Sequence, residues 1–191
     1  MKKIIGLLLA VSLICGCSDI QNNNTQNNSQ NTETAQGNKT LLYTNAAYDF
    51  SFEYPESMVV LGESVNNIVL GYSEYPGENI DIIGNLYPDG TVDRKQYLID
   101  SFYQTISSFE EKAVAGTFTH QDSMDADNGY FSTVIKFTAL NGDHSDWTVK
   151  FTLYAKGEYI YYIRAAMHSG NDMMSSTYQY ILKNFKEHNN I

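Results

Sequence analysis

The chain has 191 residues, 12 Lys plus Arg against 22 Asp plus Glu, a formal net charge of −10, and two cysteines. This length is typical of one domain with accessory segments, and a domain of that size can bury a hydrophobic core. The acidic balance argues against a nucleic-acid-binding protein, because contacts with phosphate need clustered Lys and Arg.

Residues 1–16 have the pattern of a secretory signal peptide. Lys2 and Lys3 form a basic start, and residues 4–14 form an apolar stretch interrupted only by Gly6 and Ser12. A stretch of this length suits the apolar part of a signal, whereas a membrane-spanning helix needs about 20 apolar residues.

The end of this segment resembles the lipoprotein signal of bacteria, in which an aliphatic residue, a tolerant position and Gly or Ala precede a lipid-modified Cys. Ile14, Cys15, Gly16 and Cys17 fill these places. The resemblance implies that cleavage follows Gly16 and that Cys17 carries acyl chains such as palmitate. The alternative is an ordinary cleaved signal with a structural cysteine nearby.

The lipoprotein interpretation accounts for both cysteines. Cys15 leaves with the signal and Cys17 is alkylated, so the mature chain offers no thiol for a disulfide, a metal site or a nucleophile. Two acyl chains are enough for stable anchoring. We therefore expect a protein held on the cell membrane by lipid, facing outside the cytoplasm. Loss of Lys2 and Lys3 lowers the net charge to −12, which argues against direct docking on anionic lipid.

A polar tract separates the anchor from the rest of the chain. Residues 21–32 are only Gln, Asn, Ser and Thr, and such a segment has no apolar side chains with which to offset its ordering entropy. We expect residues 17–40 to be a disordered tether that begins with the lipidated cysteine. A single folded domain is then expected over residues 41–191.

Within this domain, alternating apolar and polar residues predict strands, and Gly and Pro mark the turns. The expected strands are 48–54, 58–61, 68–72, 80–87, 113–120, 131–137, 147–153 and 159–167. The first ends at Pro55, and turns are expected at Pro88-Asp89-Gly90, Asn141-Gly142 and Lys156-Gly157. Residues 159–163 are apolar on both faces, which suits a central strand covered on both sides.

Two segments change to helical spacing. The first is 93–109, with Asp93 as N-cap, and the second begins near Asn171 or Asp172. Their apolar stripes are Leu98, Phe102, Ile106 and Phe109, and Met174, Tyr178, Ile181, Leu182 and Phe185. The order of strands, helix, antiparallel meander and helix predicts an α+β fold, with an antiparallel β-sheet flanked by helices.

Two short segments also resemble a known family. Residues 48–55, Tyr-Asp-Phe-Ser-Phe-Glu-Tyr-Pro, resemble the opening of PsbP-like domains, and residues 180–185 are similar to their closing helix. The resemblance covers about residues 41–187 and implies an α/β/α sandwich. It also implies a non-enzymatic role, because the family is generally non-enzymatic, and its bacterial members are often lipoproteins of unassigned role.

The sequence contains none of the common catalytic or phosphate-binding motifs, such as G-x-S-x-G, H-E-x-x-H or G-x-x-x-x-G-K. We therefore expect no enzymatic activity and no cofactor. The function we predict is a non-enzymatic binding or accessory module of the cell envelope, whose partner is an envelope protein or an extracellular ligand.

One polar cluster supports an alternative function. His120, Asp122, Asp125 and Asp127 could supply ligands for calcium or manganese, in a metal-binding lipoprotein or a metal-assisted enzyme. The spacing differs from an EF-hand, because the glycine is fifth from Asp125 and Lys136 stands in the place of the bidentate Glu. The competing interpretation is a polar hairpin loop.

The strand tyrosines are the other candidates for binding. An exposed row of them could bind a sugar or a peptide, but tyrosine also favours the core or the surface of a sheet, and we favour that second interpretation. The residues concerned are Tyr130, Tyr154, Tyr159, Tyr161 and Tyr162. His168 and His188, at the ends of the last helix, are expected at the surface.

Overall fold

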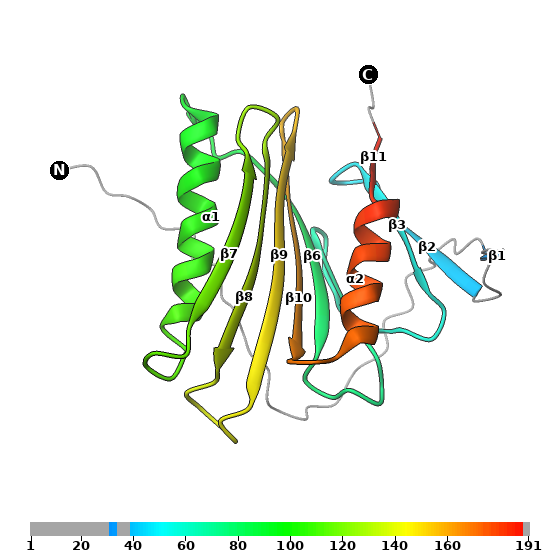
Figure 1. Ribbon diagram of the computed structural model, residues 1–191. Helices are drawn as coiled ribbons and strands as arrows, with labels where there is room; N and C mark the ends of the chain where they lie inside the picture. The colour runs from blue at the N-terminus through cyan, green and yellow to red at the C-terminus, as the bar shows by residue number, and fades with distance from the viewer. Residues whose placement is uncertain (1–30, 34–38, 189–191) are drawn as a thin grey trace.

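The computed structural model describes residues 31–33 and 39–188. These residues form two antiparallel sheets and two helices, whose arrangement can be followed in Figure 1. The smaller sheet has the order β1-β2-β3-β11. Its strands are β1 (Asn31–Glu33), β2 (Lys39–Asn45), β3 (Phe50–Pro55) and β11 (Lys186–Glu187). The predicted end of a strand at Pro55, here β3, is confirmed.

The larger sheet has the order β4-β5-β6-β10-β9-β8-β7. Its strands are β4 (Val59–Glu63), β5 (Asn67–Gly71), β6 (Asn79–Leu86), β7 (Thr119–Asp125), β8 (Tyr130–Thr138), β9 (Asp146–Lys156) and β10 (Tyr159–His168). β10 pairs with β6 on one side and β9 on the other. The predicted central position of the segment that begins at Tyr159 is therefore confirmed.

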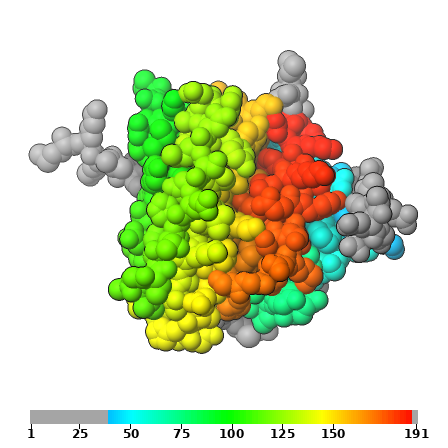
Figure 2. Space-filling model, in the orientation of Figure 1, coloured from blue at the N-terminus to red at the C-terminus, as the bar shows by residue number. Residues whose placement is uncertain are grey.

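The helices cover opposite faces of the larger sheet. α1 (Arg94–Glu110) lies over β8, and α2 (Asp172–Asn184) packs against β10 and against β3 of the smaller sheet. Figure 2 shows α2, in orange to red, between the green-to-yellow strands and the cyan part of the smaller sheet. This arrangement confirms the predicted α+β fold with helices on both sides of an antiparallel sheet.

Side chains of β10 alternate between two hydrophobic cores. Ile160 and Tyr162 belong to the core under α1, and Tyr161 and Ile163 belong to the core between α2 and the smaller sheet. This alternation follows from the period of two along a strand. The preference for Tyr161 and Tyr162 in the core is confirmed, since they are 1% and 5% exposed.

Both helices begin where the sequence predicts. The Asp93 carboxylate accepts a hydrogen bond from the Gln96 N–H at 2.9 Å, and the Asn171 side chain accepts one from the Met174 N–H at 3.1 Å. These side chains satisfy backbone donors that a first helical turn leaves unpaired. Among the described residues, neither helix has the length and the apolar content needed to cross a membrane.

One expectation about the strands was wrong, and one sheet was not expected. The strand expected at 113–120 is found at Thr119–Asp125, whose residues are exposed apart from one that is half-buried, so no apolar alternation marks it. The smaller sheet was also not expected as a separate layer. Its β1 uses Asn31–Glu33, paired antiparallel with Lys39–Leu41 of β2, inside the segment that we predicted to be a disordered tether.

Candidate functional site

A hollow of about 290 Å³ lies at one end of the larger sheet. The start of α1, the end of β6, the β7–β8 turn and the β9–β10 turn meet there. Its lining residues are Tyr87, Arg94, Lys95, Leu98, Ala126, Asp127, Asn128, Gly129, Ala155 and Gly157. We call this the α1 hollow. It combines an aromatic ring, aliphatic side chains and charged groups, which is a composition suited to binding.

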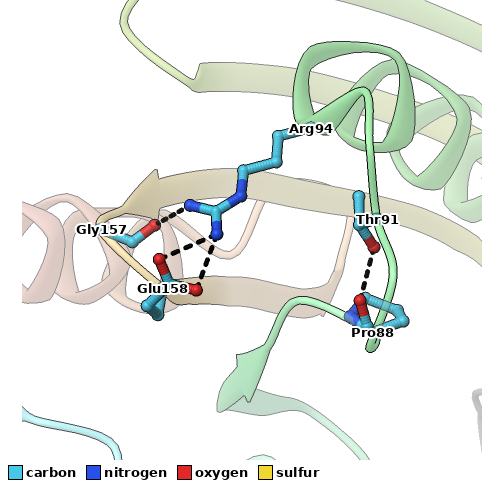
Figure 3. Close-up of polar contacts among 5 residues, drawn as sticks. All are labelled: Pro88, Thr91, Arg94, Gly157 and Glu158. Carbon is cyan, nitrogen blue, oxygen red and sulfur yellow. Dashed lines mark hydrogen bonds and ion pairs between the residues drawn. The ribbon is translucent and has the colours of Figure 1, made fainter.

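The turn before α1 sets the direction of the first helical residues. Gly90 has φ of +78°, and the Pro88 carbonyl accepts hydrogen bonds from the Thr91 N–H at 3.1 Å and from the Thr91 hydroxyl at 2.7 Å. This confirms the turn predicted from Pro88-Asp89-Gly90. Figure 3 shows the turn directing Arg94 toward the β9–β10 turn.

Arg94 joins α1 to the β9–β10 turn. Its guanidinium donates to the Gly157 carbonyl at 3.0 Å and to the two Glu158 carboxylate oxygens at 2.8 and 2.7 Å (Figure 3). The hydrogen bonds to Glu158 raise the pKa of Arg94. The guanidinium also lies over the Tyr87 ring, 4.6 Å from its centroid. One guanidinium nitrogen meets both carboxylate oxygens and another meets the carbonyl, and these contacts together orient the side chain.

A second ion pair closes the other side of the α1 hollow. Lys95 donates to the Asp127 carboxylate at 2.6 Å, and this hydrogen bond lowers the pKa of Asp127. Gly129 lets the β7–β8 turn approach β9, because its φ is +65° and a Cβ there would lie 3.1 Å from the Ala155 carbonyl oxygen. The Gly129 carbonyl accepts from the Ala155 N–H at 2.9 Å.

The structure does not gather the four residues proposed as metal ligands. His120 and Asp122 lie on β7 and share a hydrogen bond of 2.9 Å, whereas Asp125 accepts a hydrogen bond from the Asn128 side chain at 2.8 Å. Asp127 pairs with Lys95. Within residues 31–33 and 39–188, no three His, Cys, Asp or Glu side chains are arranged to hold a metal ion. The side-chain geometry therefore gives the calcium or manganese alternative no support.

The remaining predicted residues are dispersed. Cys17 lies outside the described residues. Tyr130 is 39% exposed, whereas Tyr154 and Tyr159 are half-buried, so they do not form one exposed row with Tyr161 and Tyr162. His188 is exposed as expected, but His168 is half-buried, because its ring lies 4.4 Å from the ring of Trp147.

The sequence did not identify Tyr87, Arg94 or Glu158 as neighbours. Each lies beside a turn or a helix start that the pattern did predict. Which ends of the elements meet depends on the strand order, and that order is not visible in the periodicity. Arg94 does carry one signal, because it is the first basic residue after Lys39.

No protein-family model matches the chain, and no curated protein matches it. Solved structures similar to it include a crystal structure from Bacteroides thetaiotaomicron, at 9% identity and a TM-score of 0.50, covering 78% of this chain and 48% of that one. The chain thus spans about half the length of that protein. Another is the cyanobacterial PsbP (CyanoP) of Synechocystis, at 13% identity and a TM-score of 0.49, covering 78% and 92%.

A third similar structure is LpqN of Mycobacterium tuberculosis, which is described as involved in cell envelope biogenesis. It has 11% identity and a TM-score of 0.46, and the match covers 83% of this chain and 89% of LpqN. At such identities the likeness concerns the fold alone. The hairpin, helix, meander and closing helix stand in the predicted order, and the helices flank an antiparallel sheet, so the predicted α+β fold is confirmed.

Proposed function

We propose that the chain is a lipid-anchored extracytoplasmic protein whose folded domain is a non-enzymatic binding or accessory module of the cell envelope. The observation that carries the binding role is the α1 hollow. Its charged side chains are held in fixed orientations by partners on neighbouring turns, and an aromatic ring and aliphatic groups lie beside them. The anchor is proposed from the basic, apolar and Gly-Cys pattern of residues 1–17.

The geometry of the α1 hollow suits recognition of another polypeptide. Arg94, Lys95 and Asp127 line the hollow together with Tyr87 and Leu98. The ion pairs Arg94–Glu158 and Lys95–Asp127 bring both signs of charge to it, and all four charged side chains are at least 44% exposed. A charged group of a partner can therefore replace one member of an internal ion pair, and the displaced side chain remains in contact with solvent. Such exchanges set specificity more than affinity.

Site-specific photo-crosslinking tests this role. A photoreactive residue at Lys95, at the rim of the α1 hollow, should yield one discrete crosslinked product in native envelopes. The matched control is Lys183, an exposed lysine in the last turn of α2, which should yield none. Equal products from both positions, or no product from Lys95, would contradict a binding role for the hollow.

The anchor gives a separate prediction. Replacing Cys17 by serine removes the only acylation site that the lipoprotein pattern provides, so we expect the variant to leave the membrane fraction and become soluble. Two acyl chains hold a protein stably on a membrane, whereas a protein without an acyl chain has no such anchor. Membrane fractionation with metabolic labelling by a palmitate analogue measures the effect. Cys15→Ser is the control and should stay acylated; a Cys17→Ser variant that remains acylated refutes the assignment.

A further inference from the structure

The two edge strands of the larger sheet, β7 and β4, differ in the polarity of their exposed side chains. β7 reads Thr-His-Gln-Asp-Ser-Met-Asp, so its exposed edge is polar and acidic. β4 reads Val-Val-Leu-Gly-Glu, and every one of its residues is exposed. Val59, Val60 and Leu61 are 40%, 43% and 50% exposed. Three consecutive exposed aliphatic residues on an edge strand are unusual unless they bind something.

Edge strands normally carry features that prevent another strand from pairing with them, such as charged residues or proline. β7 has such features in His120, Asp122 and Asp125. Between Val59 and Gly62, β4 has neither charge nor proline, and among residues 31–33 and 39–188 it pairs with β5 alone. The one protective feature in its described pairing is a bulge between Val60 and Gly62. The bulge shortens the ladder that an added strand can form, so aliphatic contacts must supply much of the binding.

The charge around β4 indicates which charge a partner should carry. Residues 40–93, which supply nearly all of β2 and the whole of β3–β6, contain nine Asp and Glu and no Lys or Arg. Asp49, Glu78 and Asp81 are buried, so the other six contribute the surface charge. Glu56 precedes β4, and Glu63 is its last residue; both are exposed. A second copy of the chain would bring the same negative surface to this edge, and like charges facing each other oppose pairing. The surface is complementary to an extended segment with positive charges.

We propose that β4 is a docking edge for an extended, basic segment of a partner polypeptide, which adds to the larger sheet as an eighth strand. Its aliphatic side chains would contact Val59, Val60 and Leu61, and its flanking Lys or Arg would face Glu56 and Glu63. Here the shortened backbone ladder and the aliphatic contacts together supply affinity, and side chains of alternate residues supply specificity. The edge is distinct from the α1 hollow, and the inference does not rest on the function proposed for that hollow.

The test uses the full-length protein in detergent micelles and the labelled peptide Lys-Lys-Val-Thr-Val-Thr-Val-Lys-Lys. We expect saturable binding by fluorescence anisotropy, weakened at least about tenfold by Val60→Lys, because a lysine on an edge strand opposes pairing. Met124→Lys on β7, where Met124 is 50% exposed, is the matched control and should bind as the parent does. Both positions are exposed, so both variants should fold.

Charge is tested with the same peptide carrying Glu in place of Lys. It should bind at least about tenfold more weakly, and the difference should shrink between about 50 and about 500 mM NaCl, since salt screens exposed charges. Absence of saturable binding by the basic peptide overturns the proposal, as does equal loss from Val60→Lys and Met124→Lys. A dimer of the parent protein that Val60→Lys dissociates would assign the edge to a second copy instead, and would also overturn it.

Discussion

Replacing Phe102 by alanine is expected to lower the free energy of unfolding by about 3–5 kcal/mol, the usual loss for a buried phenylalanine. Phe102 lies on the inner face of α1 and is 0% exposed. Its ring centroid lies 5.6 Å from that of Phe131 and 5.9 Å from that of Phe151. Alanine would leave a cavity between α1 and two strands of the larger sheet, where the rings cannot collapse without moving the helix.

Urea unfolding measures this loss, with Trp147 as the reporter, because it is the single tryptophan and packs against the same core. The neighbouring Tyr103 is the matched control. It is 41% exposed on the same helix, so Tyr103→Ala should cost less than about 1 kcal/mol. Equal losses at the two positions would mean that α1 does not pack on the sheet through the face described.

The second large effect is expected at an ion pair within the larger sheet. Arg164 on β10 donates to the carboxylate of Asp81 on β6 at 2.7 Å, and their side chains are 20% and 9% exposed. Removing one partner from such a pair leaves the other charge without compensation. We expect Arg164→Met to cost about 3–5 kcal/mol at about pH 7.

This loss should depend on pH. Burial raises the pKa of Asp81, and Arg164 partly opposes that rise. A carboxyl group whose pKa is raised in the folded state stabilises the fold below its unfolded value, 3.8, and that contribution is lost as the pH rises through the folded value. Without Arg164 the pKa rises further, so the variant should recover part of its stability between about pH 7 and about pH 4 as Asp81 takes up a proton.

The double variant Asp81→Asn with Arg164→Met separates charge from packing. It has no carboxylate to leave uncompensated, so it should be more stable at neutral pH than Arg164→Met alone, and its stability should not show the same recovery in acid. Urea titrations at several pH values make the comparison. A loss from Arg164→Met that is the same at every pH would show that the guanidinium acts through its contacts and not through its charge.

The helices and the central strand could be predicted because their own residues determine them. The stripe from Leu98 to Phe109 has the helical period, Asp93 is a cap that only a helix start requires, and residues 159–163 are apolar on both faces. In each case, burial on the predicted face is what the structure shows. Local pattern and tertiary environment agree at these positions, and such agreement makes sequence analysis reliable.

β7 could not be predicted in the same way. It is an edge strand with almost no buried residue, so its position is set by its pairing with β8, in which Thr119 faces Lys136 and Asp125 faces Tyr130. The cluster of His120, Asp122, Asp125 and Asp127 consequently looked like one loop in the sequence. In the structure, His120 and Asp122 lie on the strand and Asp127 lies in the turn that follows it, so these side chains have different partners.

The α1 hollow shows a related limit. The start of α1 and the turn at Lys156-Gly157 were both predicted, but only the strand order places Arg94 beside Glu158. The smaller sheet was missed because its closing strand, Lys186–Glu187, has two residues and no periodicity to detect. Both features depend on contacts between segments that lie more than 60 residues apart in the sequence.

The pairing of β11 with β3 also has a consequence for the order in which the protein can assemble. Lys186 faces Ser51 and Glu187 faces Phe50, and the ring of Phe185 stacks on that of Phe50 at 5.5 Å. Because a chain is synthesised from its N-terminus, the hairpin of β2 and β3 must wait until β11 has been made before its core can close. Nascent chains should therefore keep Phe50 and Phe52 accessible until α2 and β11 have left the ribosome, and would be candidates for chaperone binding during that interval.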